Sequence, residues 1–320
     1  MLVSVITPCF NASNYLKEAI ESVLKQTHQQ FEFIVVNDGS TDDSETIITN
    51  FQDERIRYFY QTNQGQCVAS NFGLSKATGD YIKFFDADDV MNETHLEAQL
   101  KKLNGRTDAI ASCAWGRFYD ANPLSAKFIP EPVWKEMNSL DWIKSSLAQT
   151  YDMMGGWLWL IPKQILQKSG GWDERLSLNN DFEFSMRLLL NVTDVLFAAE
   201  AKMYYRSGMD SLSQRPSINA FKAAILSTDL GCNYLLAKEN STYTQQLCAD
   251  RYQEWLFRVY PIDKEIENDL EQKIVALGGS KRKMDGGKLF QFLAAFIGWR
   301  NVKLLKLQLK KAGYKKLPFN

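Results

Sequence analysis

The first part of the chain alternates between short apolar runs and segments whose apolar residues recur at helical spacing. Leu2–Thr7, for example, is a β-rich run that ends at Pro8, and a helical pattern begins at Leu16. Strands that alternate with helices predict an α/β fold with a doubly wound, mostly parallel central sheet flanked by helices. The expected strands cover residues 2–7, 31–36, 55–60 and 81–85, and the expected helices cover 16–24, 42–51 and 65–77.

Polar clusters follow three of these expected strands at the points where the strands end. The clusters are Thr7–Asn11, Asn37–Asp42 and Asp86–Asp89. In a doubly wound sheet, ligands bind at the carboxyl ends of the strands, near the point where the strand order reverses. The sequence therefore predicts a nucleotide site built from these three clusters.

Asp86 and Asp88 directly follow an apolar strand and are separated only by Ala87. Two carboxylates held at one strand end repel each other, and a bound divalent cation relieves that repulsion. Oxygen ligands of this kind suit Mn²⁺ or Mg²⁺. The alternative is a solvated loop in which Asp88 or Asp89 caps a helix near residues 93–103, and the pattern taken alone favours this alternative.

Two further acids are open to both a functional and a structural interpretation. Asp38 lies in a turn-rich cluster, where it can accept hydrogen bonds from a base or ribose or can simply stabilise a turn. Asp181 lies at the expected start of a helix. A carboxylate there can act as a general base toward an acceptor hydroxyl, but an acid in the first turn also suits the helix dipole.

Taken together and in this order, the motifs resemble those of the family 2 inverting glycosyltransferases of GT-A fold. The resemblance covers about residues 1–215, and helical patterns follow from Ser217 onward. Asp181 falls where the family keeps its catalytic aspartate. Val3–Asn11 is similar to S-V-I-x-P-x-Y-N, Asn37–Asp42 to D-D-G-S-T-D, Phe85–Asp89 to L-D-A-D-D, Gly170–Glu174 to G-G-F-D-E, and residues 204–213 to Y-R…S-x-S.

The resemblance implies a metal-dependent enzyme that moves a sugar, with inversion, from a nucleotide diphosphate sugar of the UDP type. The implied acceptor is a saccharide or a lipid-linked glycan, and the implied setting is polysaccharide or glycoconjugate biosynthesis. Residues 1–107 would then be the nucleotide-sugar half, 108–215 the acceptor-binding and catalytic half of the same domain, and 216–320 a helical C-terminal extension with a basic tail.

The resemblance also implies a role for individual residues. Asp181 would be the catalytic base and Asp88 would hold the metal, Mn²⁺ or Mg²⁺. Trp157 and Trp172 would touch the acceptor or the diphosphate, although packing in the core is the alternative for such rings. The nucleotide would contact Thr7, Pro8, Asn11, Asp38, Ser40, Asp86 and Ala87, and the acceptor or diphosphate would also contact Glu174, Arg206, Ser211 and Ser213.

The sequence departs from the family pattern at three places. Asn37 replaces the first acid of D-D-G-S, Ser70 replaces an arginine, and the stretch around Gly208 lacks a histidine. These departures keep open a non-catalytic protein that binds nucleotide sugars. A D-x-D phosphatase is a further alternative, whereas the first strand–helix turn lacks the glycines of a dinucleotide-binding dehydrogenase.

Residues 281–320 are strongly basic, with eleven lysines and arginines against Asp285 alone. Apolar residues lie between these cations at spacings that suit an amphipathic helix, which can lie on an anionic membrane surface. Packing of this helix against the enzyme or a second copy is the alternative.

The remaining features concern the compartment. Five widely spaced cysteines without a C-x-x-C pair predict a reducing environment. The chain shows no secretory signal pattern and no apolar run of about 18 residues. We therefore expect a cytoplasmic protein that binds no nucleic acid and can associate peripherally with the cytoplasmic face of a membrane.

Overall fold

The computed structural model describes residues 1–119, 121–149, 153–208 and 217–312. The chain divides into two compact units, Met1–Lys238 and Glu239–Asn320. The helix α8 (Ile218–Lys238), which the sequence pattern assigned to the C-terminal region, belongs to the first unit. The assignment of functions to parts of the chain stays a prediction.

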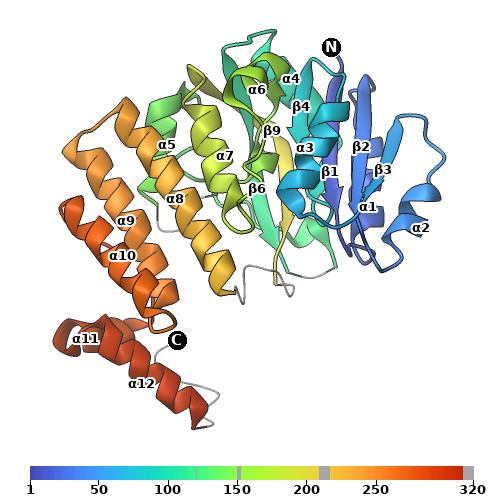
Figure 1. Cartoon of the computed structure of the whole chain (residues 1–320). Coiled ribbons are helices and arrows are strands. Elements are labelled where there is room, and N and C mark those ends of the chain that lie inside the picture. The colour runs from blue at the N-terminus through green and yellow to red at the C-terminus, as the bar shows by residue number, and fades with distance from the viewer. Residues whose placement is uncertain (120, 150–152, 209–216, 313–320) are drawn as a thin grey trace. The chain divides into compact units, whose positions relative to one another are not determined.

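The first unit is built around a five-stranded sheet with the strand order β3-β2-β1-β4-β8 (Figure 1). All neighbouring strands are parallel except β8, which is antiparallel to β4. The central strands are buried and mostly apolar, as expected for a parallel sheet covered by helices. The predicted α/β class and its first four strands are confirmed. The strands are β1 (Val3–Cys9), β2 (Phe31–Asp38), β3 (Ile56–Gln61), β4 (Tyr81–Phe84) and β8 (Ile161–Pro162).

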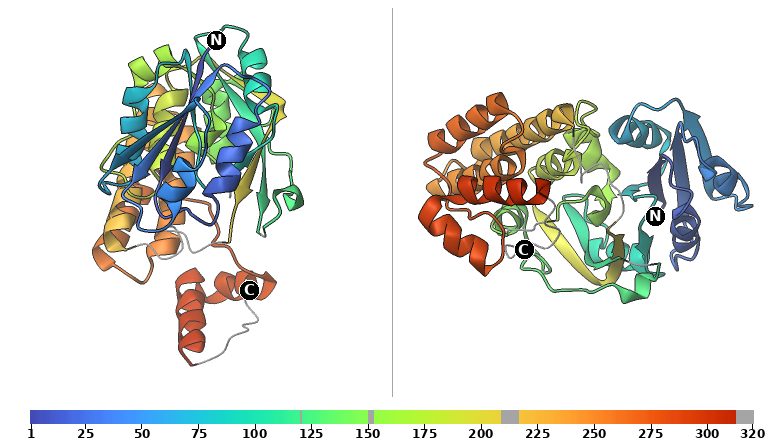
Figure 2. Two further views of the ribbon diagram at one scale, coloured as in Figure 1. Left: turned by 90° about the vertical axis from the view of Figure 1, so that its right-hand side faces the viewer. Right: turned by 90° about the horizontal axis from the view of Figure 1, so that it is seen from below.

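A second sheet with the order β5-β9-β6 lies in the region that the sequence pattern left irregular. The long strand β9 (Asp194–Arg206) pairs in parallel with β6 (Ala109–Phe118) and antiparallel with β5 (Val90–Met91) and β7 (Met137–Asn138). The helix α4 (His95–Leu103) packs on β6 and β9, and the two sheets are neighbours in both views of Figure 2.

The remaining helices of the first unit connect and cover these sheets. Among them α7 packs against α8, as Figure 1 shows. The cap of α4 is Thr94, so neither Asp88 nor Asp89 caps this helix, and the predicted capping alternative for those acids is wrong. The remaining helices of the first unit are α1 (Leu16–Leu24), α2 (Ser44–Thr49), α3 (Gln66–Lys76), α5 (Ser139–Leu147), α6 (Lys163–Ser169) and α7 (Asn180–Leu189), with the short 3₁₀ turns η1 (Pro123–Ser125) and η2 (Gly156–Leu158).

The second unit is helical throughout its described part. It contains α9 (Thr242–Val259), α10 (Lys264–Ala276), α11 (Lys288–Ile297) and α12 (Trp299–Lys311). The ring of Trp299 contacts the rings of Phe257 and Tyr260, and Arg300 pairs with Glu271, so α12 is attached to α9 and α10. No helix in the described part of the chain is long and apolar enough to cross a bilayer.

Candidate active site

Three carboxylates gather in the loop that follows β4. Ligand oxygens of Asp86, Asp88 and Asp89 all lie within 4.8 Å of one another. The loop is at the end of β4 next to β1, where the strand order reverses, which is the expected ligand site of such a sheet. Burial raises the pKa of each of the three acids, and the pKa values of Asp86 and Asp89 are raised well above the usual range because the neighbouring acids add their repulsion.

The loop is held in place by Arg206 at the end of β9. The backbone N–H of Arg206 donates to Asp89 Oδ1 at 2.8 Å, and its Nε donates to the carbonyl of Asp88 at 2.8 Å. The guanidinium lies over the rings of Tyr15 and Phe118 and pairs with Glu18. Arg206 is therefore a buried residue that positions the acidic loop, and its predicted contact with the diphosphate or acceptor stays a prediction.

The residues of this loop fit a divalent cation. Asp89 is fully buried, and its Oδ2 has no hydrogen-bond partner within the described residues. An unpaired, buried carboxylate oxygen beside two further acids is costly unless a cation offsets the charge. Asp86 and Asp88 are partly exposed and can reach a bound ion. Sequence analysis placed Asp89 in the Asp86–Asp89 cluster and gave it no individual role other than a possible helix cap.

Asp181 lies at the start of α7 and faces the same group of acids. Its Oδ1 accepts a 2.7 Å hydrogen bond from the backbone N–H of Gly156 in η2. Burial raises the pKa of Asp181 to about 6, although the Gly156 bond lowers it. The charge of Asp181 also raises the pKa of Asp86, which shows that the two carboxylates share one electrostatic site.

Gly156 is required at this position by close packing. A Cβ atom there would lie 2.5 Å from the ring of Trp172 and 3.4 Å from Asp181 Oδ1. Contacts under 3 Å force the neighbouring groups to move. The glycine thus allows the backbone to approach Asp181 closely enough to donate its hydrogen bond.

Gln66, the first residue of α3, links the two acidic segments. Its side chain donates to Asp86 Oδ1 and accepts from the amide of Asn180, each at 3.3 Å. Asn180 precedes Asp181 directly. One side chain therefore connects the loop after β4 to the helix that carries the candidate base, and sequence analysis did not identify it.

Asp38 is held by hydrogen bonds within the protein, and its predicted contact with a nucleotide stays a prediction. Its Oδ1 accepts hydrogen bonds from the side chain of Gln61 and the backbone of Gln64, and its Oδ2 accepts one from the backbone of Gly65 at 2.8 Å. With three donors and 2 % exposure, the carboxylate fixes the segment before α3. In the described structure it fills the structural role that the sequence had left open.

The other predicted nucleotide residues line the ends of β1 and β2. Asn11, which has a left-handed φ of 49°, donates its backbone N–H to Ser40 and accepts from the backbone of Thr41. Thr7 is buried, and its hydroxyl has no partner among the described residues. Phe10 is 51 % exposed, so its ring is open to a ligand in a position that sequence analysis did not single out.

The tryptophans predicted to touch the acceptor are largely buried. Trp172 stacks on Phe184 with 4.0 Å between ring centroids, and Trp157 stacks on Tyr205 at 5.6 Å. Both tryptophans are under a tenth exposed, so the structure places them in the interior. Tyr205 lies near the acidic site, because burial and the charges of Asp86, Asp88, Asp89 and Asp181 raise the pKa of its hydroxyl.

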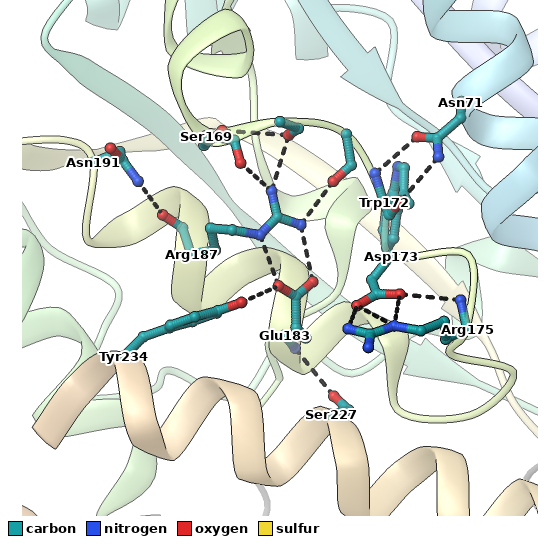
Figure 3. Close-up of polar contacts among 12 residues, drawn as sticks. Asn71, Ser169, Trp172, Asp173, Arg175, Glu183, Arg187, Asn191, Ser227 and Tyr234 are labelled. Carbon is teal, nitrogen blue, oxygen red and sulfur yellow. Dashed lines mark hydrogen bonds and ion pairs between the residues drawn. The ribbon is translucent and has the colours of Figure 1, made fainter. Parts of the chain in front are cut away.

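The segment Gly170–Glu174 is attached to α7 by a network that Figure 3 shows. The guanidinium of Arg187 pairs with both carboxylate oxygens of Glu183 and donates to the carbonyls of Ser169, Gly170 and Gly171. Asn71 donates to the carbonyl of Trp172 and to Glu174, each at 2.9 Å. This network fixes the backbone beside Asp181. Ser211 and Ser213, which were also predicted to contact the acceptor or diphosphate, lie outside the described residues.

Lys83 is a buried cation beneath the site. It lies in β4 with no exposed surface, and its ammonium donates to the carbonyl of Trp157 at 2.6 Å and to Gln99 at 3.2 Å. Burial lowers its pKa to about 8. Lys83 thus supports the turn whose Gly156 binds Asp181, and its only sequence signal is a lysine inside an apolar strand.

Comparison with known proteins gives consistent matches. The family profile described as Glycosyl transferase family 2 matches residues 4–169, just over half of the chain. An uncharacterized glycosyltransferase of Rickettsia typhi is 34% identical over 201 residues, which are 62% of this chain and 62% of that protein. Glycosyltransferase GlyA of Streptococcus pneumoniae is 38% identical over 128 residues, 39% of this chain and 18% of that protein.

Among solved structures, S. aureus TarS 1-349 in complex with UDP-GlcNAc matches with a TM-score of 0.68 and 18% identity. The match covers 87% of this chain and 80% of that one. At this identity the likeness shows the fold, which is that of TarS. The chain spans less than two thirds of the length of the R. typhi and S. pneumoniae relatives.

Proposed function

This chain belongs to glycosyl transferase family 2, and on that premise we propose that it moves a sugar from a nucleotide diphosphate sugar to an acceptor hydroxyl with inversion. The donor is a UDP-sugar, and the acceptor is a saccharide or a lipid-linked glycan. The likeness to TarS, which is described in complex with UDP-GlcNAc and with UDP, supports a uridine donor.

One observation carries the proposal: Asp181 and the acids after β4 share a single electrostatic site. A carboxylate with a pKa of about 6 is mostly ionised near neutral pH and is still basic enough to take a proton. The acceptor hydroxyl gives its proton to Asp181 while its oxygen bonds to the anomeric carbon of the donor sugar. The bond from that carbon to the diphosphate oxygen breaks at the same time, and a single displacement of this kind inverts the anomeric centre.

Asp86, Asp88 and Asp89 are the residues that would hold a divalent cation, Mn²⁺ or Mg²⁺. When bound, such an ion would offset the negative charge of the departing diphosphate. The protein's own contribution is to position these acids, which it does through Arg206 and Gln66.

The exposed ring of Phe10 and the backbone around Asn11 and Ser40 form the base and ribose end of the proposed donor site. Since Asp38 is occupied by Gln61, Gln64 and Gly65, we assign it to shaping this end. The five buried, free cysteines support a reducing, cytoplasmic setting. The basic residues of 281–320 support an anionic membrane surface as a further partner.

The test is a thermal-shift screen of UDP-sugars with Mn²⁺ or with a chelator, on the wild-type protein and on Asp88→Asn. We expect one donor to raise the melting temperature of the wild type only with the metal, because ligands that bind the native state stabilise it. Asp88→Asn should lose that shift, while the variant without ligand should melt no lower than the wild type without ligand.

Three results would contradict the proposal. If no UDP-sugar stabilises the protein with or without metal, the donor assignment fails. If the protein instead releases inorganic phosphate from simple phosphoesters without a nucleotide sugar, the phosphatase alternative replaces it. Donor binding without any transfer across many acceptors would favour a non-catalytic binding protein.

A further inference from the structure

Apolar side chains are unusually exposed on α11. Phe292 is 59 % exposed and Phe296 is 73 % exposed, and their rings contact each other with 4.9 Å between centroids. Leu289 and Ile297 are exposed by 39 % and 47 %. Leu289, Phe292 and Phe296 follow one another at spacings of three and four residues, so they lie on one face of the helix. The sequence alone predicted an apolar tail but not which side chains stay uncovered.

The opposite face of α11 attaches it to the rest of its unit. Phe290 is buried in a small core with Val302 of α12, and Leu293 and Trp299 pack against that core. Trp299 in turn contacts Phe257 of α9. The exposed face therefore lies on a fixed helix that keeps its outer apolar side chains in solvent, which is rare unless a surface binds there.

The charge around this face is predominantly positive, and Asp285 is the one acid in residues 281–312. Lys281, Lys283 and Lys288 are exposed just before or at the start of α11, and Lys310 and Lys311 are exposed at the end of α12. In the described part of the chain, the side chains of these five lysines form no ion pair, whereas Arg282 and Arg300 pair with Glu254 and Glu271. An apolar face bordered by unpaired cations complements a surface that is apolar inside and anionic outside.

We infer that the exposed face of α11 inserts into the interfacial layer of an anionic lipid bilayer, with Phe292 and Phe296 as its main apolar contacts. Lys283 and Lys288 then lie at the level of the lipid phosphates. This inference deepens the proposed membrane partner and rests on the proposed function only for the reason why the enzyme works at that surface. A binding partner of mixed charge or a neutral bilayer does not match the unpaired lysines.

The test is co-sedimentation of the full chain with vesicles of phosphatidylcholine alone and with added phosphatidylglycerol. The wild type should bind the phosphatidylglycerol vesicles, and high salt should weaken that binding. The double variant Phe292→Ser/Phe296→Ser should bind them at least about tenfold more weakly, because two phenyl rings lose their apolar environment. Val275→Ser is the matched control, since Val275 is 74 % exposed on α10 of the same unit.

The cations are tested by a second pair of variants with equal change in net charge. Lys283→Gln/Lys288→Gln should weaken binding by about fivefold for each lysine, because each cation near such a surface contributes about 1 kcal/mol. Lys264→Gln/Lys273→Gln, which removes two paired cations from α10, should bind like the wild type.

The inference is overturned if the protein binds vesicles with and without phosphatidylglycerol equally, or if Phe292→Ser/Phe296→Ser binds them as the wild type does. It is also overturned if Phe292→Ser/Phe296→Ser turns a dimer into a monomer while no vesicle is bound, because the face then meets a second copy. Metal-dependent donor stabilisation is measured on every variant, and it should be unchanged. If the double variant does not fold, Phe296→Ser alone is compared with Val275→Ser.

Discussion

Asp181→Asn should abolish transfer and at the same time make the protein more stable. The side chain keeps its size and can still accept the Gly156 hydrogen bond, but it can no longer take a proton from an acceptor. Loss of a general base lowers the rate by about 10²- to 10⁴-fold. Stability should rise because the variant removes a carboxylate that the native site holds at a cost.

The size of the stability gain follows from the pKa. Burial raises the pKa of Asp181 from 3.8 to about 6, which corresponds to about 3 kcal/mol of unfavourable free energy for the ionised form. This is an upper figure, because the side chain is only partly buried. The native protein binds this proton more tightly than the unfolded chain. The stability that Asp181 contributes is therefore fully present below about pH 4 and is lost as the pH rises through about 6.

The assay is urea unfolding of the wild type and of Asp181→Asn at several pH values between 4 and 8, with a chelator present. The stability of the variant relative to the wild type should increase by up to about 3 kcal/mol from the acidic to the neutral end. Donor-dependent release of UDP in the presence of an acceptor is measured on the same preparations. A constant stability difference across this range, or full transfer by the variant, would refute the assignment of Asp181 as a base in a partly buried site.

Three further substitutions test the surroundings of the site. Gly156→Ala should lower the free energy of unfolding by about 1–3 kcal/mol, since its Cβ would lie 2.5 Å from the ring of Trp172. Thermal unfolding measures this change. Gly105→Ala is the contrast, because its Cβ would meet no neighbouring atom and only its left-handed φ is unfavourable for alanine. Lys83→Met should remove a pH dependence of the free energy of unfolding. The ammonium of Lys83 has a pKa of about 8 in the native protein and 10.5 in the unfolded chain, so the wild type should become more stable than the variant by up to about 3 kcal/mol as the pH rises from 8 to 10.5. Urea unfolding at several pH values measures this difference. Arg187→Lys should cost about 2 kcal/mol, because a lysine cannot serve Glu183 and three carbonyls together, and unchanged melting would contradict this role.

The first four strands were predictable because each is a short apolar run that ends in a turn-rich cluster. β6 and β9 were not, because they pair across more than 80 residues and β9 includes Glu200 and Lys202 among its apolar positions. Which strand pairs with which depends on residues far apart in the chain, so the local sequence pattern gives little indication of the pairing.

For the site, the motifs indicated Asp86, Asp88 and Asp181, and the structure brings these three into one electrostatic group. The supporting residues could not be inferred in the same way. Asp89 depends on Arg206, which is 117 positions away, and Gln66 depends on contacts with two separate segments. A residue whose role is to hold another residue carries no motif of its own.

The hydrogen bonds of Asp38 affect how a loss-of-function variant at this position should be interpreted. The carboxylate fixes Gln64 and Gly65, and the next residue, Gln66, contacts Asp86. A substitution at Asp38 would thus displace Gln66 and, through it, Asp86, without any change in a direct ligand contact. An inactive Asp38 variant could therefore result from a displaced start of α3 and not from a lost nucleotide contact. Donor affinity measured together with folding stability would separate these two outcomes.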